Sequence, residues 1–133
     1  MSQENVEDYR RGIVAWNSGD LDAWLATLPP NWEFRASGVF PGTQPVYRGP
    51  DGARQLWQDM RGPWQEFNVS VERIEDLGDD VLALITFEVI GRDGLATSRR
   101  WAHVARYDYR GEPIRTENYE SWAQALKAVG LEE

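Results

Sequence analysis

The chain contains no cysteine and only one histidine, His103, among its 133 residues. Without cysteine the protein can form no disulfide, no thiolate nucleophile and no thiolate metal site. A lone imidazole, with no second histidine or cysteine beside it, argues against a dedicated zinc site. We therefore expect neither a metal ion nor another cofactor.

Basic residues are also scarce. The 14 Lys and Arg residues face 22 Asp and Glu residues, so the formal net charge is -8. This charge would repel a polyanion, and we expect no nucleic-acid partner. The chain has no apolar stretch near the roughly 20 residues that span a bilayer, and the opening "MSQENVEDYRRG" lacks the apolar core of a signal peptide. We expect a cytoplasmic protein with no membrane partner.

Aromatic residues, in contrast, are plentiful: they make up 12% of the chain and include seven Trp. No linker, repeat or low-complexity tract divides residues 1–133, so the chain is predicted to form a single domain with a sizeable core. Large aromatic side chains can fill such a core or line a cavity within it. The composition leaves both uses open.

Apolar residues at helical spacing predict three helices in the first half, near residues 6–16, 21–28 and 51–60. Asp20 and Asp51 are the expected N-caps of the second and third helices. Between these helices, residues 31–36 predict a short strand. The Gly- and Pro-rich residues 37–50 predict a long irregular loop, of the kind that often forms a lid or a binding loop.

Beyond Trp64 the apolar period changes to two, which predicts a long antiparallel meander over residues 67–119. The turns "GRDG" and "YRGE" predict hairpins, and the break in phase at Ile74 predicts a β-bulge. A closing helix is expected after Ser121, with a capping box to Gln124 and Gly130 at its end. This order predicts an α+β fold: a curved antiparallel sheet with three N-terminal helices and one short C-terminal helix.

Three segments, "AWNSGDLDAWLATL", "YRGPDGARQLW" and "GEPIRTENYESWAQALKAVGL", resemble the nuclear transport factor 2-like superfamily and its SnoaL-like branch. The resemblance implies a cone-shaped pocket and, commonly, a homodimer. Its relatives include polyketide cyclases, ketosteroid isomerase, limonene epoxide hydrolase, scytalone dehydratase and non-catalytic binding domains. A fold with so many uses leaves the function to individual residues.

Carrying over the ketosteroid isomerase site places its tyrosine at Gly12, its aspartate base at Ala36 and its late-strand acid at His103. Two of those three roles are missing, so isomerisation by that residue set is excluded. His103 nevertheless falls where a pocket-facing acid would lie.

The limonene epoxide hydrolase site maps onto Ile85, Phe87 and Asn118, none of which ionises. Epoxide hydrolysis by that route is excluded too. Because side chains alternate along a strand, the same alignment predicts an apolar binding cavity for a flat, uncharged ligand. Its expected lining is Phe34, Tyr47, Leu56, Ile85, Phe87, Trp101, Ala105, Thr116 and Asn118.

His103 is the one candidate catalytic residue, and two interpretations stay open. It is either a core histidine bonded to Asn118 or to a tyrosine hydroxyl, or a group that handles a proton or polarises a carbonyl near pH 7. No carboxylate is expected beside it. We expect acid–base chemistry of cyclase, isomerase or dehydratase type on a small apolar carbonyl compound. The alternatives are a non-catalytic binder, or a homodimeric interaction domain with a filled pocket.

The expected homodimer would use the outer face of the sheet. Arg106, Arg115 and Glu117 are predicted to lie there as cross-strand charge pairs. Tyr119 lies on the same face and is a candidate for packing between the two copies.

Overall fold

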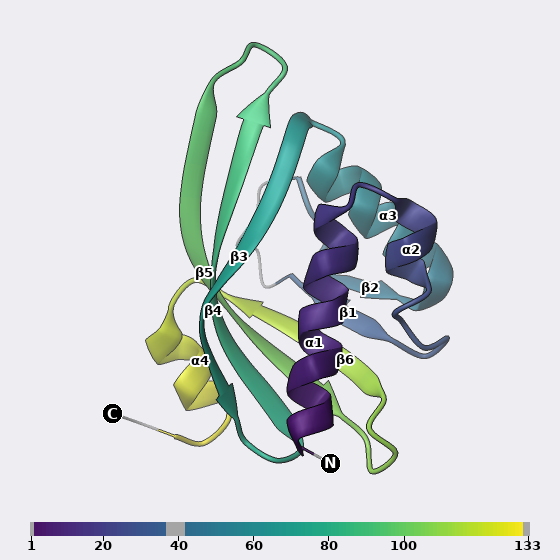
Figure 1. The fold of residues 1–133 in the computed structure, drawn as a ribbon, viewed down its shortest axis with the longest axis vertical. Helices are drawn as coiled ribbons and strands as arrows, with labels where there is room; N and C mark the ends of the chain where they lie inside the picture. Colours follow the sequence, from purple (N-terminus) through teal and green to yellow (C-terminus); the bar gives the residue numbers. More distant parts are fainter. Residues whose placement is uncertain (1, 37–41, 132–133) are drawn as a thin grey trace.

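The computed structural model describes residues 2–36 and 42–131. Three helices lie on one side of a bent six-stranded sheet and a fourth lies on the other (Figure 1). The helices are α1 (Ser2–Asn17), α2 (Leu21–Leu25), α3 (Gly49–Arg61) and α4 (Trp122–Ala128). Within the described ranges, no helix is long and apolar enough to cross a membrane.

The sheet has the strand order β2-β1-β6-β5-β4-β3. Its strands are β1 (Glu33–Arg35), β2 (Val46–Arg48), β3 (Trp64–Asp76), β4 (Asp80–Gly91), β5 (Ala96–Tyr107) and β6 (Pro113–Tyr119). All neighbours are antiparallel except β1 and β6, which run parallel. The predicted α+β architecture is confirmed, whereas the parallel pair was not foreseen.

The predicted turns connect the long strands as expected. The "GRDG" segment joins β4 to β5 and "YRGE" joins β5 to β6. Gly94 and Gly111 adopt φ angles of 87° and 79° in these turns, a region that only glycine enters at little cost. The pairing of β3 with β4 slips between Val71 and Arg73, so the predicted bulge is confirmed slightly before Ile74.

Two of the expected helix caps are also confirmed. Asp20 accepts a hydrogen bond of 3.1 Å from the backbone N–H of Ala23 at the start of α2. Ser121 accepts one of 3.1 Å from Gln124 at the start of α4. Each bond satisfies a backbone donor that has no partner inside its helix.

The prediction for residues 37–50 is wrong in part. Residues 46–48 form β2, which pairs with β1, and α3 begins at Gly49 instead of after Asp51. Arg48 is the N-cap residue without a side-chain cap, and Asp51 lies in the first turn, where its charge complements the helix dipole. Three residues are too few to show the alternating pattern of a strand. Such a strand is recognised only from its pairing with a partner strand. Residues 37–41 lie outside the described part of the chain.

The inner and outer faces of the sheet bury different sets of side chains. Inward residues such as Ile85, Trp101 and Ala105 pack in the main core under α1, α2 and α3. Outward residues Leu82 and Val104 pack in a smaller cluster against α4. The facing predicted from strand alternation is therefore confirmed for β4 and β5.

A buried carboxylate organises the rest of the outer face. Glu117 is 5% exposed and accepts two hydrogen bonds, of 3.2 and 3.1 Å, from Arg106, which also donates one to Asp80. Arg115 lies 2.8 Å from the same carboxylate, and the hydroxyl of Tyr119 donates to it at 2.7 Å. These side chains are thus engaged within one chain, and the homodimer through this face stays a prediction.

Replacing Glu117 with Gln should destabilise the protein by roughly 3 kcal/mol at pH 7, because Arg106 would keep a partly buried charge without its main partner. Burial alone would raise the pKa of Glu117, but hydrogen bonds from Arg106 and Tyr119 and the nearby arginine charges lower it from its ordinary 4.5. A lowered folded-state pKa stabilises the fold above pH 4.5, and this contribution is lost as the pH falls through the folded value.

The measurement is urea unfolding of the wild type and Glu117→Gln at several pH values. The difference between them should shrink below pH 4.5. Glu72→Gln is the control, because its ion pair with Arg100 is exposed and should contribute no more than about 1 kcal/mol. Equal losses in the two variants would contradict the prediction.

Candidate functional site

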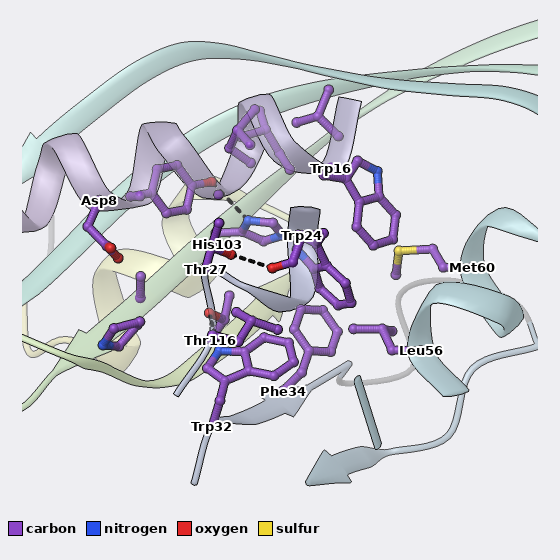
Figure 2. A pocket seen from close by; sticks show the side chains of 18 of the residues that line it. Asp8, Trp16, Trp24, Thr27, Trp32, Phe34, Leu56, Met60, His103 and Thr116 are labelled. Atoms are coloured by element: carbon purple, nitrogen blue, oxygen red, sulfur yellow. Dashed lines mark hydrogen bonds between the residues drawn. The ribbon is translucent and has the colours of Figure 1, made fainter. Parts of the chain in front are cut away.

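A cavity of about 110 Å³ lies between the inner face of the sheet and the helices α1, α2 and α3. Its wall is mostly apolar, and the side chains of Trp16, Trp24, Phe34 and Leu56 point toward one another across it (Figure 2). An engineered apolar cavity of about 150 Å³ holds benzene. The present cavity is somewhat smaller, so its size suits a ligand of no more than about one ring.

The tryptophans of the wall belong to the core and to the cavity at once. The rings of Trp16 and Trp24 lie 5.1 Å apart edge to face, and those of Trp24 and Trp32 lie 5.8 Å apart. All three are less than 9% exposed, yet all three line the cavity. Such edge-to-face contacts hold the wall in a fixed shape. The two uses of aromatic residues that the composition left open are thus combined.

The structure brings seven of the ten predicted site residues to this cavity. They come from β1, α3, β4, β5 and β6, and they are Phe34, Leu56, Ile85, Trp101, His103, Ala105 and Thr116. Thr116 is held in place, since its hydroxyl oxygen accepts a hydrogen bond of 3.3 Å from the indole of Trp32. Their role in binding stays a prediction.

Tyr47 and Phe87 are not among the described residues that line the cavity. The hydroxyl of Tyr47 donates to Asp59 and accepts from the backbone N–H of Gln44, both at 2.7 Å. Phe87 packs against Trp101, with ring centroids 4.2 Å apart. Both residues are buried in the core outside the cavity lining.

Asn118 does not meet its predicted partner either. It lies directly opposite His103 in the pairing of β5 with β6 and is completely buried. Neither polar atom of its side chain has a hydrogen-bond partner. Of the two partners considered for a core histidine, Asn118 and a tyrosine hydroxyl, His103 bonds a tyrosine hydroxyl, that of Tyr9.

The bond between Tyr9 and His103 is the central polar contact of the cavity. The hydroxyl oxygen of Tyr9 lies 2.9 Å from Nδ1 of His103, along the dashed line that reaches the imidazole in Figure 2. Burial lowers the pKa of His103 to about 4 and raises that of Tyr9, because a low-dielectric surrounding disfavours the charged form. At neutral pH both groups are therefore uncharged.

A second polar pair lines the same cavity and was missed in the sequence. The hydroxyl of Tyr107 donates a 3.1 Å hydrogen bond to Oδ2 of Asp8, and Oδ1 of Asp8 lies 3.5 Å from Arg11. Burial raises the pKa of Asp8, and the contacts with Tyr107 and Arg11 offset this only in part. Asp8 thus adds a carboxylate to the cavity wall that the sequence did not indicate, whereas the hydrogen bond described for His103 is to Tyr9.

Two of the missed residues, Asp8 and Tyr9, come from α1. The family alignment had pointed to Gly12 in this helix instead. Gly12 does line the cavity, and Tyr9 precedes it by about one helical turn on the same face. The apolar spacing of Tyr9, Ile13 and Trp16 marked this face as buried. It gave no signal that the hydroxyl of Tyr9 would reach β5, since that depends on how the helix crosses the sheet.

Comparison with known families agrees with the fold. The sequence profile of the SnoaL-like domain matches residues 6–115. The chain belongs to the SnoaL-like domain family. No curated protein has a significantly similar sequence. Among the described residues, no group of three or more His, Asp or Glu side chains is placed to hold a metal ion.

Solved structures with the same fold extend over nearly the whole SnoaL-like chain. An NTF2-like protein of unknown function from Burkholderia pseudomallei K96243 superposes with a TM-score of 0.77 at 21% identity, covering 93% of this chain and 95% of its own. TerC, co-crystallised with polyporic acid, gives 0.77 at 16% identity, with 96% and 98% covered. The Δ5-3-ketosteroid isomerase from a Mycobacterium species gives 0.72 at 18% identity, with 89% and 93% covered. At these identities the likeness establishes the NTF2-like fold alone.

Replacing Asn118 with Leu should raise the free energy of unfolding by roughly 1 kcal/mol or more, because it removes a buried amide that has no partner. Asn17→Leu is the matched control. The amide of Asn17 both donates to and accepts from the backbone of Val69, at 2.8 and 2.7 Å, so its loss should destabilise the fold by roughly 1–3 kcal/mol. Thermal and urea unfolding measure both variants, and destabilisation by Asn118→Leu would show that the amide is bonded in solution.

Proposed function

We propose that this SnoaL-like protein binds a small, flat, uncharged carbonyl compound in the cavity and catalyses proton transfer next to the carbonyl. The reaction class is that of isomerases, cyclases or dehydratases. The observation that carries the proposal is the hydrogen bond between Tyr9 and His103 in a mostly apolar wall. Buried polar groups cost free energy, and a pair that faces a cavity can recover this cost by binding a polar ligand atom.

The chemical role that suits His103 is hydrogen-bond donation. When the hydroxyl of Tyr9 donates to Nδ1, the proton of the neutral imidazole is carried by Nε2, which is then a donor. A donor aimed at a carbonyl oxygen stabilises the negative charge that this oxygen gains as a neighbouring C–H bond breaks. Because the cavity is apolar, water does not weaken this interaction.

General-base catalysis by His103 itself is less well supported. A base works best when its pKa lies near the working pH, whereas burial lowers the pKa of His103 to about 4. A neutral imidazole that stays neutral is suited to holding an oxyanion. Ketosteroid isomerase similarly keeps an acid protonated by burying it, so that the acid can donate a hydrogen bond.

The alternative is a non-catalytic binder that uses the same cavity. It is favoured by the apolar lining, which by itself is sufficient to hold a ring-shaped ligand. The two functions differ in one respect only: a catalyst speeds proton exchange at the carbon next to the carbonyl, and a binder does not.

The imidazole of His103 should titrate near pH 4 in the free protein, because its surroundings disfavour the charged form. Proton NMR measures this directly, since the chain has a single histidine. Adding acetophenone, a flat aromatic ketone of one ring, should shift the imidazole signals at pH 7. Titration near pH 6.5 without any response to the ketone would contradict the proposed site.

His103→Ala should reduce proton exchange at the methyl group of acetophenone about 100-fold or more, as is typical when a donor to an oxyanion is lost. Exchange is followed in D₂O by the loss of the methyl proton signal. Tyr9→Phe should also slow exchange, because it frees Nδ1 and leaves the imidazole tautomer unfixed. Wild-type protein that binds the ketone without accelerating exchange would identify a binder.

A further inference from the structure

Asp8 is the one acidic side chain among the described residues that line the cavity. We propose that Asp8 is the general base of this site: it removes a proton from the carbon next to the ligand carbonyl while His103 holds the carbonyl oxygen. This inference rests on the proposed function and assigns the half of the proton transfer that His103 is not suited to perform.

The geometry places the two polar pairs on the same two elements. Asp8 and Tyr9 are consecutive in α1, and their partners Tyr107 and His103 both lie on the inward face of β5. All four residues line one cavity. The cavity wall therefore carries a carboxylate and an imidazole, each held by a tyrosine hydroxyl.

The contacts of Asp8 position its carboxylate and still leave some of its hydrogen-bond acceptor positions free. Tyr107 donates one hydrogen bond to Oδ2, and Arg11, whose side chain is 64% exposed, lies 3.5 Å from Oδ1. A carboxylate has about four acceptor positions, so lone pairs remain for a proton from the ligand. A carboxylate whose only role was to anchor α1 would not need a place on the cavity wall.

The two polar pairs differ in charge, so each suits a different part of a proton transfer. Asp8 faces Tyr107 from β5 and Arg11 and Tyr9 from its own helix, and only Arg11 among these is charged at neutral pH. Burial raises the pKa of Asp8, which strengthens it as a base, while the imidazole stays neutral. At neutral pH the carboxylate is thus an anion that can accept a proton, and the neutral imidazole is a hydrogen-bond donor.

The step itself balances without an oxidant or a second reactant. The C–H proton moves to a carboxylate oxygen of Asp8, the C–H electron pair forms the carbon–carbon double bond of an enolate, and the carbonyl electrons move to the oxygen held by His103. Return of the proton from Asp8 to the same carbon gives exchange, and return to another carbon of an unsaturated ligand gives isomerisation.

The test is the Asp8→Asn variant, assayed in parallel for binding of acetophenone and for exchange of its methyl protons. Binding, read from the imidazole signals of His103, should change less than about threefold, while exchange should fall about 100-fold or more. Tyr107→Phe keeps the carboxylate and loses only its positioning bond, so exchange should fall by about tenfold with binding unchanged.

Asp59→Asn is the matched control, because Asp59 also bonds a tyrosine hydroxyl, that of Tyr47, outside the cavity lining. It should leave both readouts at the wild-type level. Exchange by Asp8→Asn at the wild-type rate would overturn the role of Asp8 and leave the proposed function intact. Binding without exchange in the wild type would overturn the proposed catalysis itself, and with it the base. Circular dichroism confirms that each variant is folded.

Discussion

The hydrogen bond between Tyr9 and His103 ties the first helix to the middle of the sheet, and the shape of the cavity depends on it. The two residues are 94 positions apart in the chain, and one comes from α1 and the other from β5. Since both groups are buried and neutral, each needs the other to offset the cost of leaving water. Rotation of the helix would break this bond together with the bond between Asp8 and Tyr107, which joins the same two elements.

Curvature of the sheet is the second constraint, and the sequence carried enough information to predict it. Long strands with two apolar faces, hairpin turns with glycine and a bulge in β3 together specify a bent meander. What could not be predicted was β2 and the pairing of β1 with β6. Three residues are too few to show a period, and the parallel pairing of β1 with β6 joins segments about 80 residues apart. Such contacts exist only once the rest of the fold has formed.

The candidate site also has a part that could be predicted from the sequence and a part that could not. Inward positions on β4, β5 and β6 follow from the family resemblance together with the period of two, so Ile85, His103 and Thr116 could be placed from the sequence. The contribution of α1 could not. A helix places a residue on a face, but its crossing angle and height over the sheet decide which side chain reaches the cavity. Asp8 and Tyr9 therefore emerged only from the tertiary structure, although the buried face of their helix was recognised.

The polar groups of the cavity differ in how fully the fold alone explains them. This difference argues that some of them have a chemical role and do not serve packing alone. Thr116 is bonded to Trp32 and is fully explained by structure. The Tyr9–His103 and Asp8–Tyr107 pairs are satisfied internally and still face the cavity. A protein selected for stability alone would replace a half-buried carboxylate and a desolvated imidazole with apolar side chains, which is often neutral or stabilising. Retaining one anionic and one neutral group on the same apolar wall fits a site in which a proton leaves carbon while charge gathers on oxygen.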